Sequence, residues 1–490
     1  MKKISNRNYA IRKIADFAGV IILVGLLLFI WQLYRGSIAI PFLKPYIIKA
    51  LNHDDTDYQV TIDGVYLELV RSVQPLRIIA GNVVYKKENA ITINAPKVAL
   101  SFSIKALLRG IIAPSRIDID QPKIYIYNKY GLQKESETKD EINQKKLEYY
   151  YDVAALFWER FNSEDNIYPE SYINDINITN ADVELLEVDF GKKWQFSDVN
   201  YHFNRGMTKL KTEINALMPF SQSTSSLGLN VEYNYKTSQA ELGFYFSDLI
   251  PAELLNIITP NEASKEFNNI NIPLHGNIKT TFNFNDLSQY KSNIIENSSK
   301  IIDKIIFELN GEKGTIKFAN DENYAYDISG LILKGELNGD LEHIKITDAS
   351  LNLDNQTATL GLNIDGLKDW LVNSNKEKLK ISLTAKVPEL ETDKLSRFWP
   401  KYFGEKAWTW CKESLFGGMI KNGDFEFNFA YDKNSKALAF DNLKGIADIE
   451  DGNIIYINTM PKVSNIYGKA HFSERNIRID LNKAKSMMWC

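Results

Sequence analysis

Apolar and polar residues alternate along most of this chain with a period of two. In the stretches 227–235 and 358–364, an apolar residue stands at every second position and Gly, Asn, Thr or Glu stands between. Because successive side chains of a β-strand point to opposite faces, each such strand has one apolar and one polar face. The pattern starts near Tyr58 and predicts a mainly β, mostly antiparallel protein with short turns.

One stretch near the N-terminus breaks the alternation, because Phe17–Tyr34 contains no charged residue and is almost wholly apolar. As a helix, its roughly 18 residues would span about 27 Å, close to the thickness of a bilayer's hydrocarbon core. Basic residues are in excess before it, which predicts a transmembrane helix with a cytoplasmic N-terminus and the bulk of the chain on the far side. The residues assigned to this membrane anchor are Phe17, Val20, Leu23, Leu27, Phe29, Trp31 and Tyr34.

A cleaved secretory signal is the alternative interpretation of this stretch, and Ser37-Ile38-Ala39 has the small residues of a cleavage site. The apolar run is longer than the roughly 7–15 residues of such a signal. Arg35 also interrupts the approach to the cleavage site. These observations favour an uncleaved anchor, and under both interpretations the bulk of the chain is exported.

Short helical stretches interrupt the strands. Pro41–Asn52 is predicted to form an amphipathic helix, which either lies along the membrane surface or packs as a cap on the first strands. Lys134–Lys146 is dense in charge and predicts a solvated linker. The other predicted helices are Ile104–Arg109, Leu147–Phe161, Asp248–Leu255 and Lys406–Gly418.

These features divide the chain into four parts. Residues 1–35 are the cytoplasmic N-terminus and the transmembrane helix, and residues 36–133 form a first β unit. Residues 134–170 are a linker with an amphipathic helix, and residues 171–490 form a repetitive β region. The strand pattern continues almost to the last residue, so we expect a chain that ends within its repeat. Within the repetitive region, the glycines expected in turns are Gly311, Gly314, Gly330, Gly335 and Gly339.

The apolar faces of so many strands need a partner. Two sheets packed face to face would be the ordinary solution. A single long sheet curled into a groove, apolar inside and polar outside, better explains unbroken alternation and short turns on a membrane-anchored chain. At about 4.8 Å per strand, about 25 strands would make a groove on the order of 100 Å long. An apolar surface of that size needs an apolar occupant, and acyl chains fit it. The residues proposed to line it are Leu229, Val231, Tyr233, Phe244, Phe246, Phe282, Phe284, Leu360, Leu362, Phe427 and Phe429.

Composition narrows the class of protein. A hydrophobic content of 44% excludes a disordered chain, and a net charge of −4 argues against binding of nucleic acid. The two cysteines are too few for a disulfide framework. The five histidines lie far apart, so none pairs with another at the spacing of metal ligands.

The sequence contains no catalytic motif that stands out from its strand pattern. Asp118 and Asp120 share one face of a predicted strand, an arrangement that could seat paired carboxylates but is more typical of a solvated face. Cys411 has tryptophans beside it and no nearby His in the sequence, so packing is expected there. Trp399, Trp408 and Trp410 are expected to anchor a helix on the sheet. We therefore expect no enzyme, no cofactor and no metal site.

Several segments resemble the AsmA-like family of Gram-negative envelope proteins, in particular its YhdP/TamB branch. Ile93–Gly131 contains a strand, the short helix IKALLR and a further strand segment with a proline within it and a glycine after it, in the order that family members show. Phe398–Phe429 is similar to the branch's Trp-Pro, Trp-helix and Gly-strand segment. Further similar segments are Ile173–Gly206, Phe246–Leu255, Asn269–Phe284 and Ile455–Ile479.

The resemblance implies a single-pass inner-membrane protein, mostly periplasmic, that carries phospholipid along an apolar β-groove toward the outer membrane. Its implied partners are phospholipid, the inner membrane, and outer-membrane or periplasmic proteins. Family members continue through more strands, so the resemblance also implies a C-terminally shortened copy. The alternative function is a periplasmic scaffold that assists the assembly of outer-membrane proteins by pairing with their strands at an open sheet edge.

Overall fold

The computed structural model of the chain is mainly β. The predicted linker Lys134–Lys146 lies outside the described residues, as does the predicted helix Leu147–Phe161 except for Tyr149 and Asp152. The structure describes residues 3–52, 57–70, 76–129, 149, 152, 168–188, 191–220, 223–258, 270–283, 289, 296–317, 325–354, 356–373, 375, 377–399, 405–432, 437–455, 461–473 and 476–486.

The chain forms two compact units. The first unit contains Met1–Leu132 and Asp152–Met207, and the second contains Gln133–Tyr151 and Thr208–Cys490. The first unit thus extends past residue 171, where the sequence analysis placed the start of the repetitive region. The cause is strand pairing, because the strand that begins at Asp175 pairs with strands of the N-terminal part of the chain.

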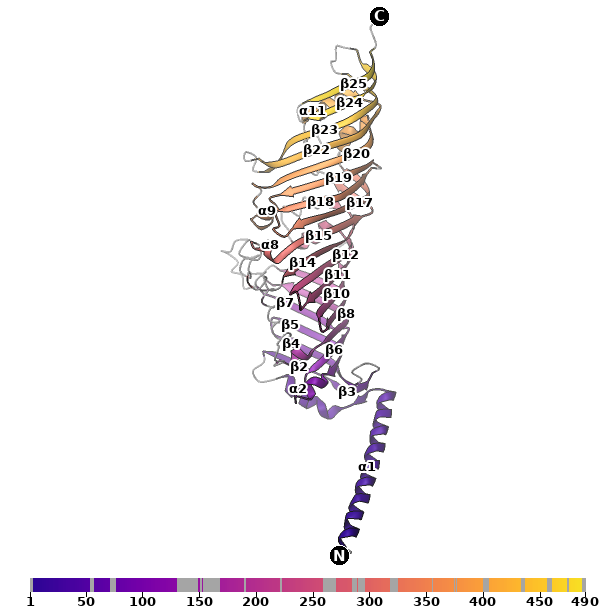
Figure 1. Ribbon diagram of the computed structural model, residues 1–490, viewed down its shortest axis with the longest axis vertical. Helices are drawn as coiled ribbons and strands as arrows, with labels where there is room; N and C mark the ends of the chain where they lie inside the picture. The colour runs from indigo at the N-terminus through magenta and orange to yellow at the C-terminus, as the bar shows by residue number, and fades with distance from the viewer. Residues whose placement is uncertain are drawn as a thin grey trace. The chain divides into compact units, whose positions relative to one another are not determined.

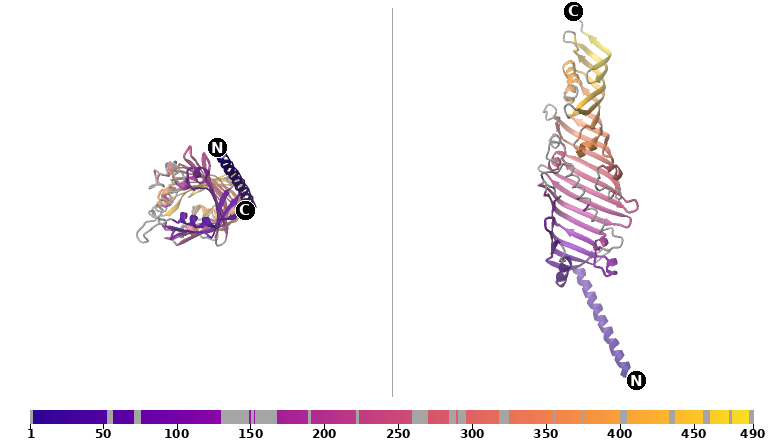
Figure 2. Two further views of the ribbon diagram at one scale, coloured as in Figure 1. Left: turned by 90° about the horizontal axis from the view of Figure 1, so that it is seen from below. Right: turned by 90° about the vertical axis from the view of Figure 1, so that its left-hand side faces the viewer.

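Helix α1 spans Lys3–Arg35 and begins the first unit. Its segment Phe17–Arg35 has 19 residues and a mean hydropathy of 2.3. The seven predicted anchor residues are all exposed, from 47% at Phe29 to 68% at Phe17. Figure 2 shows α1 leaving the strands as one continuous helix. The prediction of one N-terminal helix long and apolar enough to cross a membrane is confirmed.

The strands of the first unit form one mixed sheet. β1, β3, β4 and β5 pair in that order, all antiparallel, and β2 pairs with the second half of β4. β6 and β7 both pair with β5 and run parallel to β8, which pairs antiparallel with β9. The bounds are β1 Ile38–Ala39, β2 Tyr58–Thr61, β3 Gly64–Leu69, β4 Leu76–Lys87, β5 Ile91–Phe102, β6 Pro114–Asp120, β7 Lys123–Asn128, β8 Asp175–Glu187 and β9 Lys192–Arg205, with the helices η1 Pro41–Leu43, α2 Lys44–Leu51, α3 Ile104–Leu107 and η2 Pro169–Tyr172.

Helix α2 packs as a cap on the first strands. Leu43, Ile47 and Ile48 contact the buried cluster that contains Val60 of β2. Asn52 ends the helix, because its Nδ2 donates a hydrogen bond to the Ile48 carbonyl at 3.1 Å and another to the Val60 carbonyl at 2.8 Å. Of the two alternatives for this segment, the packed cap is the one that the contacts support.

The strands of the second unit follow one another in chain order, and each long strand pairs antiparallel with the next long one (Figure 1). Three short strands add to this series: β13 pairs with β16, β16 with β17, and β21 with β23. The bounds are β10 Lys209–Pro219, β11 Thr224–Asn234, β12 Gln239–Leu249, β13 Ile270–Asn271, β14 Leu274–Asn283, β15 Ile302–Gly311, β16 Gly314–Lys317, β17 Ala325–Asn338, β18 His343–Leu353, β19 Gln356–Asp365, β20 Lys380–Glu391, β21 Leu415–Phe416, β22 Met419–Asp432, β23 Ala437–Ile454, β24 Val463–Ser473 and β25 Ile477–Ser486.

The helices of the second unit connect these strands. Helix α5 begins at Pro251, which suits the first turn because its missing N–H has no partner there. Helix α11 ends at Ser414 and strand β21 follows it directly, so the prediction that Gly417 and Gly418 stop this helix was wrong. The two glycines, with φ angles of 63° and 75°, connect β21 to β22 instead. The bounds are α5 Pro251–Ile258, α8 Ser298–Ile301, α9 Leu367–Asn373, η5 Thr392–Lys394, α10 Leu395–Phe398 and α11 Glu405–Ser414.

Two of the glycines expected in turns lie inside a strand instead. Gly330 and Gly335 belong to β17, so that prediction was wrong for them. Gly335 is directly opposite Phe307, and a Cβ at this position would lie 2.7 Å from the Phe307 Cζ atom. Gly276 has the same relation to Phe246, at 2.9 Å. These glycines give an aromatic ring of the neighbouring strand room to lie over the backbone.

Asn and Asp residues within strands mark β-bulges. Asn422, Asp451 and Asn465 have φ angles of 51°, 57° and 51°, and each lies where the pairing register shifts. Short polar side chains tolerate this left-handed conformation better than other non-glycine residues do. A bulge increases the local twist of a strand, so these residues influence how the C-terminal strands bend.

Candidate functional site

Strand register brings the apolar residues of successive strands onto one face of the second unit's sheet. Residues directly opposite each other in a strand pair point to the same face. An unbroken series of such pairs crosses eight strands from β12 to β22, and all its members except Thr280 are apolar: Leu242, Thr280, Ile305, Leu337, Ile344, Ile364, Ile381 and Phe429. We call this side of β10–β22 the apolar face.

Parallel rows widen the apolar face on both sides of this series. Ile214 of β10 lies opposite Leu229, which lies opposite Phe244 of β12. Phe244 in turn lies opposite Ile278 of β14. Farther along the chain, Leu362, Leu383 and Phe427 are directly opposite one another in β19, β20 and β22. The apolar face is therefore several residues wide along each strand.

Ten of the eleven residues proposed from the sequence to line a groove lie on the apolar face, and Phe284 lies outside the described residues. Tyr233 and Phe246 are buried, at 7% and 8% exposure. Half-buried side chains make up the other eight: Leu229, Val231, Phe244, Phe282, Leu360, Leu362, Phe427 and Phe429. The sequence pattern thus identified residues that share a face although they come from five different strands.

The opposite face of the same strands carries paired charges. Glu232 accepts from Lys209 and from Lys211, and both contacts hold the pKa of Glu232 below its usual range. Glu308 and Lys334 form a similar cross-strand pair at 2.8 Å. A cavity of about 420 Å³ on this polar face, over β11–β15, is lined by residues of both charges. Ion pairs between solvent-exposed side chains contribute little to stability, and they are typical of a solvated surface. We therefore describe this face as solvated.

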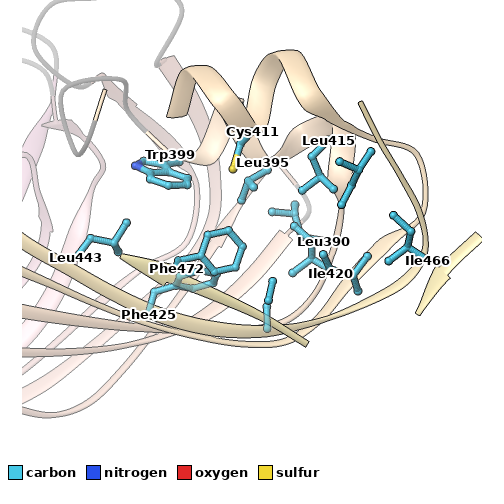
Figure 3. Close-up of a cluster of buried hydrophobic side chains, with 14 residues drawn as sticks. Leu390, Leu395, Trp399, Cys411, Leu415, Ile420, Phe425, Leu443, Ile466 and Phe472 are labelled. Atoms are coloured by element: carbon cyan, nitrogen blue, oxygen red, sulfur yellow. The ribbon is translucent and has the colours of Figure 1, made fainter. Parts of the chain in front are cut away.

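The C-terminal strands differ, because helices α10 and α11 cover their apolar side. Figure 3 shows Trp399 and Cys411 on the helical side of a buried cluster, facing Phe425 and Phe472 on the strands. The Trp399 and Phe472 rings meet edge to face with centroids 6.2 Å apart. We call this cluster the closed core; its buried residues are Leu390, Leu395, Trp399, Cys411, Leu415, Ile420, Phe425, Leu443, Ala447, Ile449, Ile454, Ile466, Ala470 and Phe472.

The expected roles of the tryptophans and of Cys411 are confirmed by this packing. Trp408 and Trp410 contact the closed core, and Trp408 Nε1 donates to the Ser396 carbonyl at 3.2 Å. Cys411 is 4% exposed, and burial raises the pKa of its thiol to about 12. A thiol in this environment is a packing group, because only the thiolate is strongly nucleophilic.

Both carboxylates of the pair on β6 have hydrogen-bond partners. Asp118 accepts from Arg116 at 2.9 Å and lies 3.4 Å from Arg77, while Asp120 accepts a hydrogen bond from Thr179 at 2.8 Å. These contacts are those of a solvated strand face, as the sequence analysis favoured. Within the residues that the structure describes, no group of three or more His, Cys, Asp or Glu side chains could hold a metal ion.

The alternation of apolar residues does not show how differently the two parts of the apolar side are covered. Phe427 was predicted to line the groove, whereas in the structure it also contacts the closed core. The signal that could have found this is the helical insertion Lys406–Gly418, since its tryptophans need an apolar surface to pack on. Comparison of the chain with protein-family models, with curated proteins and with solved structures gives no match.

Proposed function

We propose that this chain is a membrane-anchored lipid carrier of the AsmA-like family, YhdP/TamB branch, and that acyl chains lie against its apolar face. The observation that carries the proposal is the series of directly opposed residues across eight strands, which are apolar at every position except Thr280. A continuous apolar surface rimmed by polar residues is typical of a site that binds something apolar.

Most side chains of the apolar face are half-buried, which suits the binding of a lipid that moves along the face. Each CH₂ group removed from water contributes about 0.8 kcal/mol, so a lipid with two acyl chains is held firmly. Successive strands offer similar apolar rows, and a lipid that shifts by one strand exchanges one set of contacts for an equivalent set. Movement along the face would then cost little while departure into water would cost much.

The charged groups of these strands lie away from the proposed lipid site. Charged pairs such as Lys334 with Glu308 occupy the face opposite to the apolar one, in contact with solvent. In the proposal the apolar side curls into a groove, headgroups stay in water at its open side, and α1 holds the chain in the inner membrane with its bulk in the periplasm. Transfer would proceed from that membrane toward the outer membrane.

Photo-crosslinking at two adjacent residues tests the proposal. Benzoylphenylalanine replaces Phe244 on the apolar face in one variant of the full chain, and Tyr245 in the matched control. Tyr245 is 38% exposed and points to the polar face, so the two probes differ in face but hardly in position. We expect phospholipid adducts at position 244 and none at 245 when intact cells are irradiated and the protein is analysed by mass spectrometry.

The other outcomes are equally informative. Polypeptide adducts at position 244 would favour the alternative function, a scaffold that assists the assembly of outer-membrane proteins, over the lipid carrier. Equal phospholipid adducts at both positions, or none at either, would contradict binding of lipid on the apolar face.

A further inference from the structure

Exposed apolar side chains gather in one short segment of the first unit. Within Ser103–Ala113, which we call the apolar loop, Ile104 is 65% exposed, Leu107 51%, Leu108 84% and Ile112 76%. Single exposed apolar residues are common on protein surfaces, but four within one loop form a patch that indicates an interaction site.

The apolar loop has a defined conformation. Its small residues Ala106 and Ala113 are fully buried and Ile111 packs against them, whereas the other four large apolar residues are exposed. The Ser103 side chain accepts a hydrogen bond from the Ala106 N–H at 3.2 Å, and the Ser103 N–H donates to the Ala113 carbonyl at 3.0 Å. Ile111 also donates its N–H to the Ala106 carbonyl, at 3.0 Å. These hydrogen bonds fix the backbone in a conformation that leaves Ile104, Leu107, Leu108 and Ile112 exposed.

Strand register places the apolar loop at the same end of the strands as the C-terminal end of helix α1. Ile38 of β1, Leu67 of β3, Ile78 of β4 and Leu100 of β5 are directly opposite one another in turn. Helix α1 ends at Arg35, just before Ile38, and the apolar loop begins just after Phe102. Because each of these strands runs antiparallel to the next, the start of β1 and the end of β5 lie at the same end of the sheet. Helix α1 and the apolar loop are therefore both at that end. Three strand spacings separate them laterally, or about 14 Å.

A further exposed apolar residue of the first unit lies at the same end of the strands, in a different connection. Asp175 of β8 lies opposite Arg116 of β6 and opposite Asn204 of β9. Met207 follows Asn204 beyond the strand's end, and its side chain is 102% exposed. The end of the strands next to α1 thus carries exposed apolar residues from two separate connections.

The charges of the apolar loop have one sign. Lys105 and Arg109 are exposed, and no Asp or Glu occurs between Ser103 and Ile117. Basic residues beside exposed Leu and Ile side chains are the combination that binds at a membrane surface, since anionic headgroups attract the cations while the apolar groups enter the acyl region.

We propose that the apolar loop inserts into the surface of the bilayer that α1 crosses, on the side where the strands lie. The loop would hold the first unit against the membrane and fix its orientation there. This inference rests on α1 as a membrane helix, and it holds whether or not lipid moves along the apolar face.

Fluorescence quenching in vesicles tests the inference with the full chain. A Cys490→Ser background leaves Cys411, which is buried, and a single cysteine is introduced as Leu108→Cys or Ile112→Cys and labelled with an NBD fluorophore. The control is Glu88→Cys, an exposed position in the hairpin between β4 and β5, at the opposite end of the same strands. The labelled proteins are reconstituted into vesicles of phosphatidylethanolamine and phosphatidylglycerol.

We expect blue-shifted emission at positions 108 and 112, and several-fold stronger quenching by lipids with a nitroxide on the acyl chain than at position 88. Emission at both positions like that of the control would overturn the inference. Blue-shifted emission without quenching by these lipids would also overturn it, because the loop would then pack against a second copy of the chain. Leu108→Glu, added to the Ile112→Cys variant, should return the emission toward that of an aqueous label. Its thermal unfolding should stay unchanged, since Leu108 is 84% exposed.

Discussion

The closed core and the middle of the apolar face use the same kind of strand in different ways. In the closed core, Ile420, Leu443 and Ile449 are each 1% exposed beneath α10 and α11. On the apolar face, Leu229 and Leu362 occupy equivalent alternating positions and are only half-buried. The comparison shows that alternation of apolar and polar residues gives a strand an apolar side. That side becomes a buried core only where another segment, here α10 and α11, covers it. In the proposed carrier, a lipid takes the place that α11 takes at the C-terminal end.

Thiol reactivity should separate the two regions by the largest factor. Burial raises the pKa of Cys411 from 9.0 to about 12, which lowers its thiolate fraction at pH 8 about a thousandfold. In a Cys490→Ser background in detergent, an added Leu362→Cys should react with DTNB roughly a hundred to a thousand times faster than Cys411. Comparable rates would mean that the closed core opens readily or that Leu362 is covered.

Alanine substitutions should separate the regions by several kcal/mol. Leu443→Ala removes a fully packed side chain and should lower the local stability by about 2–5 kcal/mol. Leu362→Ala removes a half-buried one, and we expect a loss of about 1 kcal/mol. Hydrogen exchange of peptides from β23 and β19, followed by mass spectrometry, measures the two effects separately. Equal losses would show that the apolar face is packed as tightly as the closed core.

A charge on the apolar face should reduce the amount of bound lipid severalfold. Leu362→Asp places a carboxylate among acyl chains, where an unpaired charge costs several kcal/mol. Asn363→Asp adds the same carboxylate one residue away on the opposite face, and it should leave the bound lipid unchanged. Phe282→Glu should behave like Leu362→Asp. Mass spectrometry of phospholipid that co-purifies with each variant measures the effect, and Leu362→Ala controls for loss of the side chain alone.

The smallest expected effect is a pH dependence on the polar side of the second unit. The hydrogen bond of His343 with Asp365, at 2.7 Å, raises the pKa of His343, and Asp340 and Glu342 act in the same direction. This contribution to stability is fully present below the ordinary histidine pKa of about 6.5 and is lost as the pH rises through the raised value. His343→Gln should therefore destabilise β18 slightly at pH 5.5 and hardly at all at pH 8.5, as measured by hydrogen exchange corrected for its intrinsic pH dependence. An equal effect at both pH values would exclude the charge of His343 as its source.

Much of the fold follows from patterns within a few residues. The helix Phe17–Arg35 is recognisable from its composition, and Pro251 marks the start of α5 because its backbone preference is intrinsic. The residues that share the apolar face could likewise be chosen from the period of two. Each of these features depends on neighbours in the sequence, so a single sequence is sufficient to find it.

Other features depend on partners that are distant in the chain. Gly335 was expected in a turn, and its position inside β17 makes sense only beside Phe307 of β15. The bulge at Asn465 is equally invisible in the alternation, because it is defined by the register against β23 and β25. The parallel pairing of β8 with β6 and β7, which extends the first unit to Met207, joins strands separated by a long connection.

The side to which each strand residue points is a local property of an extended backbone, and alternation in the chain is enough to assign it. Whether that side is covered is a property of contacts between remote segments, such as Trp399 with Phe472, and it emerges only from the folded arrangement. The exposed Leu108 and the buried Ala106 of the apolar loop show the same distinction. Their spacing predicts a helical turn, but the burial of Ala106 depends on contact with Tyr172, which is distant in the chain.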